Sequence, residues 1–422
     1  MKSRSCAIAA GITVVVIGLV ITVAALLCNA YRVSNTVPVI KTPRMTMPSP
    51  NAFDYFVKAG KQLDVPKDFD PRTCSSIEQA AILKKNRTAL ETLRSGLGYS
   101  YMHPLKYGID ATYPEYSQFR TIARLLAAES QTRAGVGDWA RAIGICLDGM
   151  MMGEQSVHGG GLMGMYVGTS MQHICREEAW RAIDQLTPAQ ARYAIARLNA
   201  ISLRHLPVHR TLQEEKLLGS LGLQDLLSGK CKDSEYKSLP ELPNRIKRKT
   251  LIRYGEFMDE SIRTVRRPYA DKPPIPEMER CNNPLLFAWE GPVNVILTLW
   301  CLPCDGLWLS DLRCQTQNRL LQTSLALRAY RVEKGAYPDK LTDLVPTYLH
   351  SLPKDLFATR GTFGYRREGN RYVLWSVGPD SKNDQGKPIS KGPIGHSKAP
   401  PTDAFVSRAE SKGDIVASIN DR

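Results

Sequence analysis

Two cysteines close together near the C-terminal third of the chain offer the most reactive chemistry in the sequence. Cys301 and Cys304 stand in a Trp-Cys-Leu-Pro-Cys run. A dithiol at this spacing, placed at the N-terminus of a helix, has a lowered thiol pKa and exchanges disulfides with other thiols. The apolar residues from Val293 to Leu299 precede it and fit a short strand. Thiol–disulfide exchange is therefore the one concrete catalytic hypothesis.

The order of residues around this pair resembles a thioredoxin-type active site, which implies an envelope thiol–disulfide oxidoreductase. A thioredoxin-like fold needs further strands and a cis-proline loop after the helix. The residues that follow Cys304 lead into a different module. A structural disulfide or packed thiols are the alternative, and the irregular spacing of the ten cysteines fixes no connectivity.

Two pairs of histidine and glutamate have a spacing that can bind a metal ion. Glu154 and His158 stand four residues apart, as do His173 and Glu177, on segments that we predict to be helical. Such pairs bind metal when two helices bring them face to face. The Glu-x-x-His and His-Glu-x-x-His spacings are both absent from the sequence. We therefore expect surface ion pairs.

A cluster of glycines could bring backbone N–H groups close to a phosphate. It lies between His158 and Met165, and no Lys-Ser or Lys-Thr pair follows it. The run therefore differs from a nucleotide-binding loop. We expect a tight turn between two closely packed helices.

The composition is that of a globular protein with a basic surface. The 422 residues are 43% hydrophobic and 23% charged, with a net charge of +15. These values exclude a disordered chain. The basic residues are scattered except at 245–249 and 263–267, and no aromatic side chains are interleaved with them as in single-strand binders. We expect no nucleic-acid partner.

The N-terminus predicts a membrane anchor. Lys2 and Arg4 precede an apolar run from Cys6 to Cys28, which is long enough for a spanning helix of about 20 residues. Cleavage after Ala30, as in a signal peptide, is the alternative. We expect a single-pass protein of the cell (inner) membrane, with most of the chain outside the cytoplasm. Residues 1–30 form the cytoplasmic end and the anchor, and residues 31–50 form a Pro-rich linker that holds the folded part off the bilayer.

Helical patterns dominate residues 51–310, so the fold is predicted to be mainly α. Asp138 and Thr187 are expected to cap the starts of two helices. The helix–turn–helix pattern around 134–142 is similar to a tetratricopeptide repeat, but it does not recur at a fixed period. One irregular α-helical domain is the alternative. We expect residues 228–292 to be irregular, with short helical pieces such as 246–258.

Residues 311–422 are predicted to form a small α+β domain. A long helix from Leu320 to Lys334 ends at Gly335, which suits a left-handed cap. Two strands meet at a turn around Gly369, and residues 414–419 supply a third. The helix is expected to pack on this antiparallel sheet.

This module resembles the C-terminal domain of the major pseudopilin of bacterial type II secretion. The matching runs are Ala329–Arg331, Gly335–Pro338, Leu341–Pro346, Tyr348–Leu349, Leu352–Asp355 and Leu374–Asp380. The resemblance implies a calcium loop held by Asp380, Asn383 and Asp384, whose oxygen atoms suit that ion. An Asx-turn loop without metal is the alternative.

The whole chain resembles singly anchored bacterial envelope proteins that place a helical domain before such a module. The N-terminus lacks the cleavage and methylation motif of pseudopilins. The resemblance therefore implies a structural or protein-interaction role at the envelope, associated with a secretion or pilus-like system, rather than assembly into a pseudopilus. Other envelope proteins are the expected partners, and a non-enzymatic role is expected over the oxidoreductase.

Overall fold

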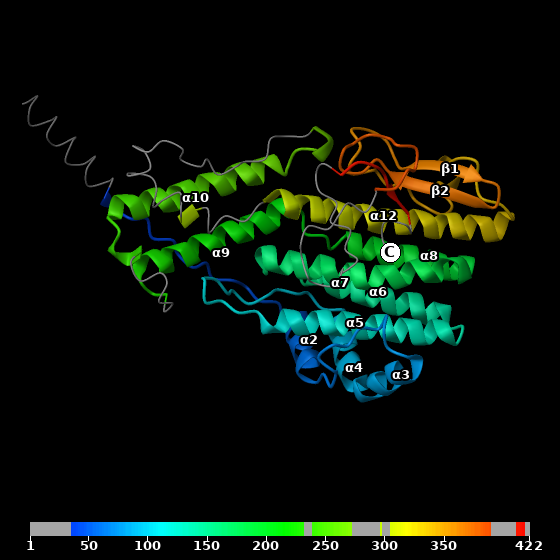
Figure 1. The fold of residues 1–422 in the computed structure, drawn as a ribbon, viewed down its shortest axis with the longest axis horizontal. Coiled ribbons are helices and arrows are strands. Elements are labelled where there is room, and N and C mark those ends of the chain that lie inside the picture. Colours follow the sequence, from blue (N-terminus) through cyan, green and yellow to red (C-terminus); the bar gives the residue numbers. More distant parts are fainter. Residues whose placement is uncertain (1–34, 232–238, 272–295, 298–303, 390–410, 418–422) are drawn as a thin grey trace, which may run out of the picture.

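The computed structural model describes residues 35–231, 239–271, 296–297, 304–389 and 411–417 (Figure 1). Over these ranges the chain is mainly helical and carries one small antiparallel sheet. The longer helices are α2 (Ala52–Lys61), α3 (Ser76–Lys85), α4 (Arg87–Gly96), α5 (Pro114–Gly135), α6 (Trp139–Gln155), α7 (Gly161–Ala182), α8 (Pro188–Ser202), α9 (Val208–Ser228), α10 (Asn244–Thr264) and α12 (Cys304–Lys334). The strands are β1 (Gly364–Glu368), β2 (Arg371–Ser376) and β3 (Ile415–Val416).

The helices α5, α6, α7 and α8 form the centre of the molecule, where α6 packs on α5, α7 and α8. The helices α2 to α4 cover α5 on one side, and α12 with the sheet covers the opposite side (Figure 1). Local capping starts two of the central helices as predicted. The Asp138 side chain accepts a hydrogen bond from the Arg141 N–H, and Thr187 forms a capping box with Gln190.

The helix α12 is longer than its sequence pattern predicts, because it begins at Cys304 rather than at Leu320. Its earlier part carries the polar residues Asp311, Gln315, Gln317 and Asn318, all of them buried. A search for apolar periodicity misses such a segment. One hydrophobic core cluster includes side chains of the central helices, α12 and the sheet. The expected division of the chain after residue 310 falls inside α12.

The sheet has the order β1-β2-β3, and both pairings are antiparallel. Gly369 lies in the turn between β1 and β2 with φ of 60°, a conformation that favours glycine. Gly335 ends α12 with φ of 81°. The sheet packs on α12 through β2. A long helix on a three-stranded sheet is the arrangement that the sequence predicts.

A second hydrophobic core lies between α9 and α10. Here the predicted helical piece 246–258 is confirmed, and it is part of one continuous helix over residues 244–264, longer than expected in a segment predicted to be irregular. Every third or fourth side chain of that helix is buried, including Ile246, Tyr254, Met258 and Ile262. The charged residues between them obscured this apolar face. Residues 272–292 of the predicted irregular segment lie outside the described residues.

The predicted membrane span at residues 6–28 lies outside the described residues. Within the described ranges, no helix combines the length and the apolar character that crossing a membrane requires. The described part of the predicted linker does not stand apart from the folded chain. Val37 and Ile40 pack against the core of α9 and α10, and Ile40 exchanges backbone hydrogen bonds with the Gln224 side chain.

Candidate functional site

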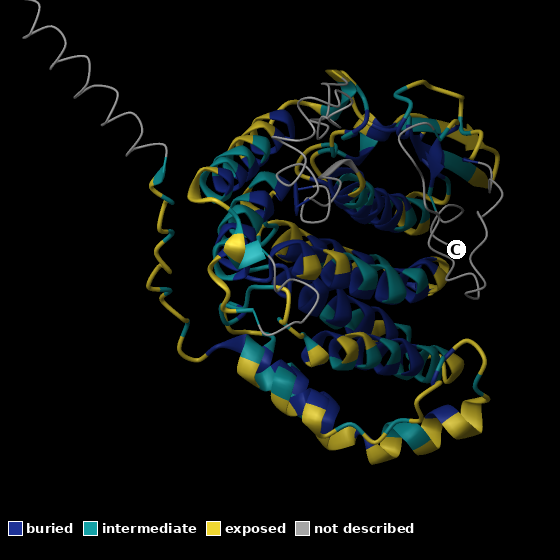
Figure 2. Cartoon of the chain, turned by 60° about the vertical axis from the view of Figure 1, so that its left-hand side comes forward, coloured by how far each residue is buried: buried dark blue, intermediate teal, exposed yellow. Residues whose placement is uncertain are grey.

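A groove of about 900 Å³ lies between α3 and α4 on one side and α5, α6 and α8 on the other. It exists because α3 packs loosely: among its ten residues only Gln79 is buried. Figure 2 shows this outer part of the molecule largely exposed, in contrast to the central helices. The volume is at the upper end of the range for ligand pockets, about 300–1,000 Å³.

The floor of the groove is a set of paired charges. Oδ1 of Asp148, in α6, accepts a hydrogen bond from Nη2 of Arg197 at 2.8 Å. Oδ2 of the same carboxylate lies 3.5 Å from Nε of Arg94. Arg94 also pairs with Glu129 of α5, and Arg197 donates to the Tyr193 hydroxyl. These contacts tie α4, α5, α6 and α8 together. They hold the floor arginines in place and leave little of the Asp148 charge uncompensated.

The rim of the groove carries cations that the protein itself does not neutralise. Lys84 and Arg133 form no ion pair with any side chain in the described part of the chain, and Arg141 lies 4.0 Å from Asp138. In total, six cationic side chains line the groove against three carboxylates, Glu91, Glu129 and Asp148. The cations are Lys84, Arg87, Arg94, Arg133, Arg141 and Arg197. An anionic ligand is therefore favoured.

The lining of the groove combines charged and apolar side chains. Its lining contains no histidine, cysteine or serine that could act as nucleophile or base. Its three carboxylates are all engaged in ion pairs with arginines. The half-buried Leu83 adds apolar surface, whereas Leu90 and Ile145 of the lining are only 3% and 6% exposed. A ligand with both acidic and apolar groups matches this lining.

A buried polar layer joins α12 to the central helices at a different place. Nδ1 of His205, in the connection between α8 and α9, lies 3.2 Å from Oε1 of Glu154, and Nε2 lies 3.6 Å from Oδ2 of Asp311. Burial alone lowers the pKa of His205, but Asp311 and Glu154 outweigh it and raise that pKa to about 10. The adjoining cavity of about 10 Å³ has room for at most one water.

The same layer continues through side-chain hydrogen bonds into α7. Gln172 donates to Glu154 and accepts from Asn318, at 3.0 and 2.8 Å. Arg176, whose side chain is among the largest that are fully buried, donates to Asn318 at 3.0 Å and to Gln317 at 2.6 Å. Among the described residues no group of three or more histidine, cysteine or acidic side chains is placed to hold a metal ion. The hydrogen bonds of the layer connect α12 to α6 and α7.

The prediction of surface ion pairs for the histidine–glutamate pairs is wrong for Glu154 and His158. Glu154 is 1% exposed, because α7, α12 and the residues around His205 cover the end of α6. His158 contacts the Arg204 carbonyl instead, at 3.1 Å. Glu177 forms its ion pair with Arg181, at 3.2 Å.

The glycine cluster forms a tight turn between α6 and α7, as predicted. The protein supplies its own anion there, because the N–H groups of Gly159 and Gly161 donate to the Glu214 carboxylate. Leu162 donates likewise to Glu215. Burial, opposed by these hydrogen bonds, raises the pKa of Glu214 to about 7. A phosphate would have to displace both carboxylates.

No family model, curated protein or solved structure matches this chain.

The predicted calcium ligands lie together in the loop after β2. Two of their side chains already accept hydrogen bonds from backbone N–H groups of the loop. Asp380 accepts from the Lys382 N–H, and Oδ1 of Asn383 accepts from the Trp375 indole and the Gln385 N–H. These are the Asx-turn contacts of the alternative interpretation. Asp384 donates its backbone N–H to a third acidic residue, Asp414, which the sequence did not single out.

Asp414 holds this loop against β3. Its carboxylate accepts from the N–H groups of Asp384 and Gly386, at 3.2 and 2.6 Å. Burial raises its pKa to about 6, and the charges of Asp384 and Asp380 add to that effect. The three acidic groups are therefore close enough to interact. Calcium binding by Asp380, Asn383 and Asp384 stays a prediction.

The predicted redox pair lies almost wholly outside the described residues. Cys301 is not described, and Cys304 is placed only as the first residue of α12. Cys74, Cys146, Cys175, Cys231 and Cys314 are free thiols. Burial raises the pKa of Cys146 to about 12 and that of Cys314 to about 11. Both therefore act as small apolar side chains rather than as nucleophiles.

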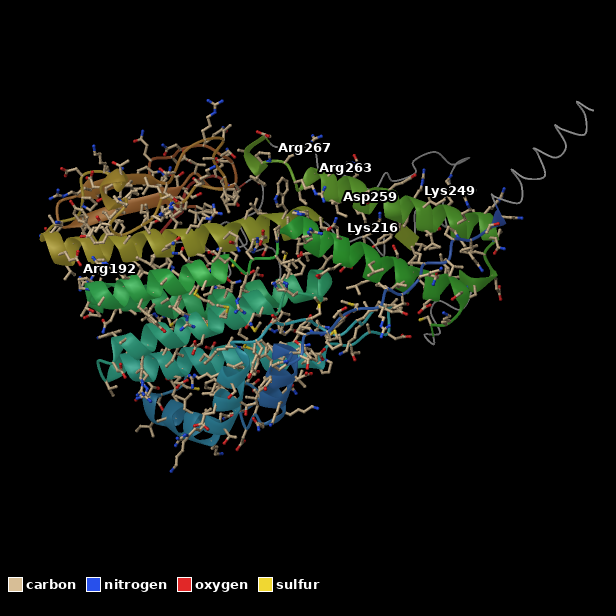
Figure 3. All side chains as sticks on the ribbon, turned by 180° about the vertical axis from the view of Figure 1, so that it is seen from behind. Arg192, Lys216, Lys249, Asp259, Arg263 and Arg267 are labelled. Carbon is tan, nitrogen blue, oxygen red and sulfur yellow. The ribbon has the colours of Figure 1, made fainter. Side chains whose placement is uncertain are left out.

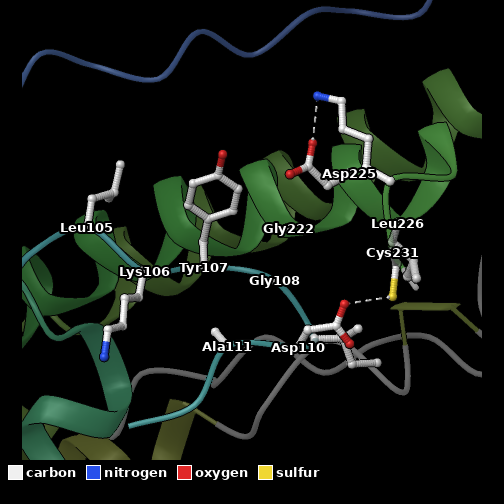
Figure 4. A pocket seen from close by; sticks show the side chains of 12 residues that line it. Leu105, Lys106, Tyr107, Gly108, Asp110, Ala111, Gly222, Asp225, Leu226 and Cys231 are labelled. Atoms are coloured by element: carbon white, nitrogen blue, oxygen red, sulfur yellow. Dashed lines mark hydrogen bonds and ion pairs between the residues drawn. The ribbon is translucent and has the colours of Figure 1, made fainter. Parts of the chain in front are cut away.

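A smaller pocket of about 340 Å³ lies between residues 105–111 and the C-terminal part of α9 (Figure 4). Its charged groups have partners within the protein. Lys230 pairs with Asp225 at 3.1 Å, Cys231 donates to Asp110, and Lys106 pairs with Glu115 at 2.7 Å. This pocket therefore offers an incoming ligand less unused charge than the groove does.

Proposed function

We propose that this chain is a membrane-anchored envelope protein with a protein-interaction role, and that its groove binds an acidic segment of a partner protein. The observation that carries this proposal is the rim of the groove. Lys84 and Arg133 stand over a floor whose carboxylates are already paired with arginines. The protein thus presents positive charge for which the groove contains no matching negative charge.

A peptide segment fits the groove better than a small anion. The cations are contributed by α3, α4, α5, α6 and α8, so one phosphate or carboxylate would reach only a few of them. Leu83 is half-buried at the groove and would stay partly exposed beside a small ion. A segment that alternates acidic and apolar side chains contacts both kinds of surface. Peptide recognition in grooves between helices commonly uses such combinations.

Binding of two matched peptides tests this proposal. The probes are fluorescent 12-residue peptides, one of alternating glutamate and leucine and one of alternating lysine and leucine, titrated onto the full chain in detergent. We expect anisotropy to report binding of the glutamate peptide alone. The double substitution Lys84→Ala/Arg133→Ala should weaken that binding about 5- to 10-fold, since exposed charge pairs contribute up to about 1 kcal/mol each.

The matched control removes two cations that lie outside the groove, in Arg263→Ala/Arg267→Ala. These residues are exposed at the far end of α10. The control should bind the glutamate peptide as the parent chain does. Equal binding of both peptides, or equal losses in both double variants, would show that the groove is not an acidic-peptide site.

The anchor is the second part of the proposal. Lys2 and Arg4 before the apolar run of residues 6–28 support it. Alkaline carbonate extraction of cell membranes measures it directly. The full chain should stay in the membrane pellet, whereas a chain that starts at Asn35 should be released. Association with a secretion or pilus-like system is supported only by the likeness of the C-terminal module to pseudopilins.

A further inference from the structure

The basic run at the start of α10 is unused by the groove. Arg245, Lys247, Arg248 and Lys249 place four cations within five positions. All four side chains are exposed or half-buried. The middle of the same helix is acidic, because it carries Glu256, Asp259 and Glu260. The cations of this segment therefore gather at the start of α10 and, at residues 263–267, at its end.

This end of α10 lies where the N-terminal segment joins the folded chain. Val37 and Ile40 pack on the core shared by α9 and α10, and Gln224 of α9 holds Ile40 through two hydrogen bonds. Figure 3 shows Lys249 toward the end of the molecule where the described chain begins, with Arg263 and Arg267 farther from it. Val37 and Ile40, the residues through which the N-terminal segment packs on the fold, therefore lie at the same end of the molecule as the basic run.

The length of chain between the predicted anchor and this corner is short. Val37 stands nine positions after Cys28, the end of the apolar run. A fully extended chain covers about 3.3–3.6 Å per residue, so these residues reach at most roughly 30 Å. A domain held on so short a tether meets the bilayer with the surface next to the tether. That surface includes the basic run.

We propose that the start of α10, from Arg245 to Lys249, contacts anionic lipid headgroups of the membrane that holds the N-terminal anchor. This inference rests on the anchor of the proposed function. Clustered cations next to a membrane segment are attracted to the negative surface potential of anionic lipids. The contact fixes how the groove is turned relative to the membrane. It also explains why these cations are gathered at the tether.

Energy transfer to labelled lipids measures the contact in the full chain. A donor dye is attached through a clickable amino acid at position 241, an exposed residue just before α10. The chain is reconstituted into vesicles of phosphatidylcholine, or of phosphatidylcholine with one-third phosphatidylglycerol, each with a headgroup-labelled acceptor lipid. We expect higher transfer with phosphatidylglycerol in about 0.02 M salt. The difference should vanish in about 0.5 M salt, where the Debye length is only about 4 Å.

Two triple variants of equal charge localise the effect. Arg245→Gln/Arg248→Gln/Lys249→Gln should lose the difference between the two kinds of vesicle. Arg263→Gln/Arg266→Gln/Arg267→Gln, at the other end of α10, should keep it. Equal transfer in both vesicles with the unmodified chain would overturn the inference, whatever the variants do. So would loss of the signal in the second variant alone.

The outcomes also distinguish the headgroup contact from the membrane anchor. A chain that inserts into pure phosphatidylcholine vesicles and shows no dependence on phosphatidylglycerol has the anchor but not the headgroup contact. A chain that binds only the phosphatidylglycerol vesicles, and is released by salt, has the contact but not the anchor. A chain that binds neither overturns both. Retention of the signal when an acidic protein, rather than lipid, carries the acceptor would identify a protein partner instead.

Discussion

The groove and the buried polar layer are made from the same kinds of side chain in different surroundings. Arg94 and Arg197 in the groove keep 33% and 28% of their side-chain surface exposed, whereas Arg176 in the layer keeps 1%. A charge taken out of water must be matched inside the protein, so the layer joins helices to one another. A charge left at the surface loses little hydration and stays available to a ligand. Substitutions should therefore affect folding in the layer and binding in the groove.

Removing the buried arginine should have the largest effect on stability. Arg176→Ala leaves Asn318 and Gln317 without their donor and opens a cavity. We expect the free energy of unfolding, from urea denaturation of the full chain in detergent, to fall by about 3–5 kcal/mol. Arg192→Ala is the matched control, because its ion pair with Glu333 at 2.7 Å is exposed (Figure 3). It should lose at most about 1 kcal/mol. Equal losses of stability in the two variants would contradict the expected difference between a buried and an exposed arginine.

Two glycines of α6 give a second comparison. A Cβ at Gly153 would lie 2.6 Å from the Gly168 carbonyl oxygen, on the face where α6 and α7 approach closely enough for Glu154 to reach Gln172. Gly153→Ala should therefore cost about 1–3 kcal/mol of stability. A Cβ at Gly144, on the groove wall, meets no atom within 4 Å. Gly144→Ala should stabilise the helix by about 0.5–1 kcal/mol. Thermal denaturation distinguishes the two, and destabilisation by both would remove the predicted difference.

We expect His205 to make the stability of the fold depend on pH. Its pKa is raised to about 10 in the folded protein, from an ordinary value of about 6.5. The protonated ring therefore stabilises the fold fully below about pH 6.5, and this contribution is lost as the pH rises through 10. The groups that face it are Glu154 of α6 and Asp311 and Gln315 of α12.

The measurement compares His205→Gln with the parent chain at several pH values. The variant should be less stable by about 1–2 kcal/mol at pH 7, since it loses hydrogen bonds to charged partners. That deficit should shrink as the pH rises from about 7 to about 10. Comparing the two chains cancels the titration of other groups. A deficit that stays constant over this range would mean that the ring is not held in its charged form.

Local signals in the sequence predict much of this fold, because capping and turn chemistry act over a few residues. Asp138, Thr187, Gly335 and Gly369 each mark a boundary that the structure confirms. The layer could not be predicted in this way. Glu154, His205 and Asp311 are each more than 50 residues apart in the chain, and nothing in their spacing indicates that they meet.

The groove could not be predicted from the sequence either, for a different reason. Its floor and rim draw on five helices, and the sequence suggests neither that α3 packs loosely nor which arginines share one hollow. Asp148 illustrates this. Its two arginine partners lie 54 residues before it and 49 residues after it, at Arg94 and Arg197. Scattered basic residues in the sequence thus become one cationic surface only in the folded chain.

The smallest expected stability effect lies at the rim of the groove. Lys84→Ala/Arg133→Ala removes no ion pair among the described residues, so the free energy of unfolding should change by less than about 0.5 kcal/mol. Asp148→Asn tests the same groove by removing a negative charge instead of positive charges. It leaves Arg94 and Arg197 with one carboxylate fewer, so it should cost about 1 kcal/mol of stability and raise the affinity for the glutamate–leucine peptide. If affinity instead falls in Asp148→Asn, then Asp148 positions the arginines for the ligand, and their placement matters more than the net charge of the groove.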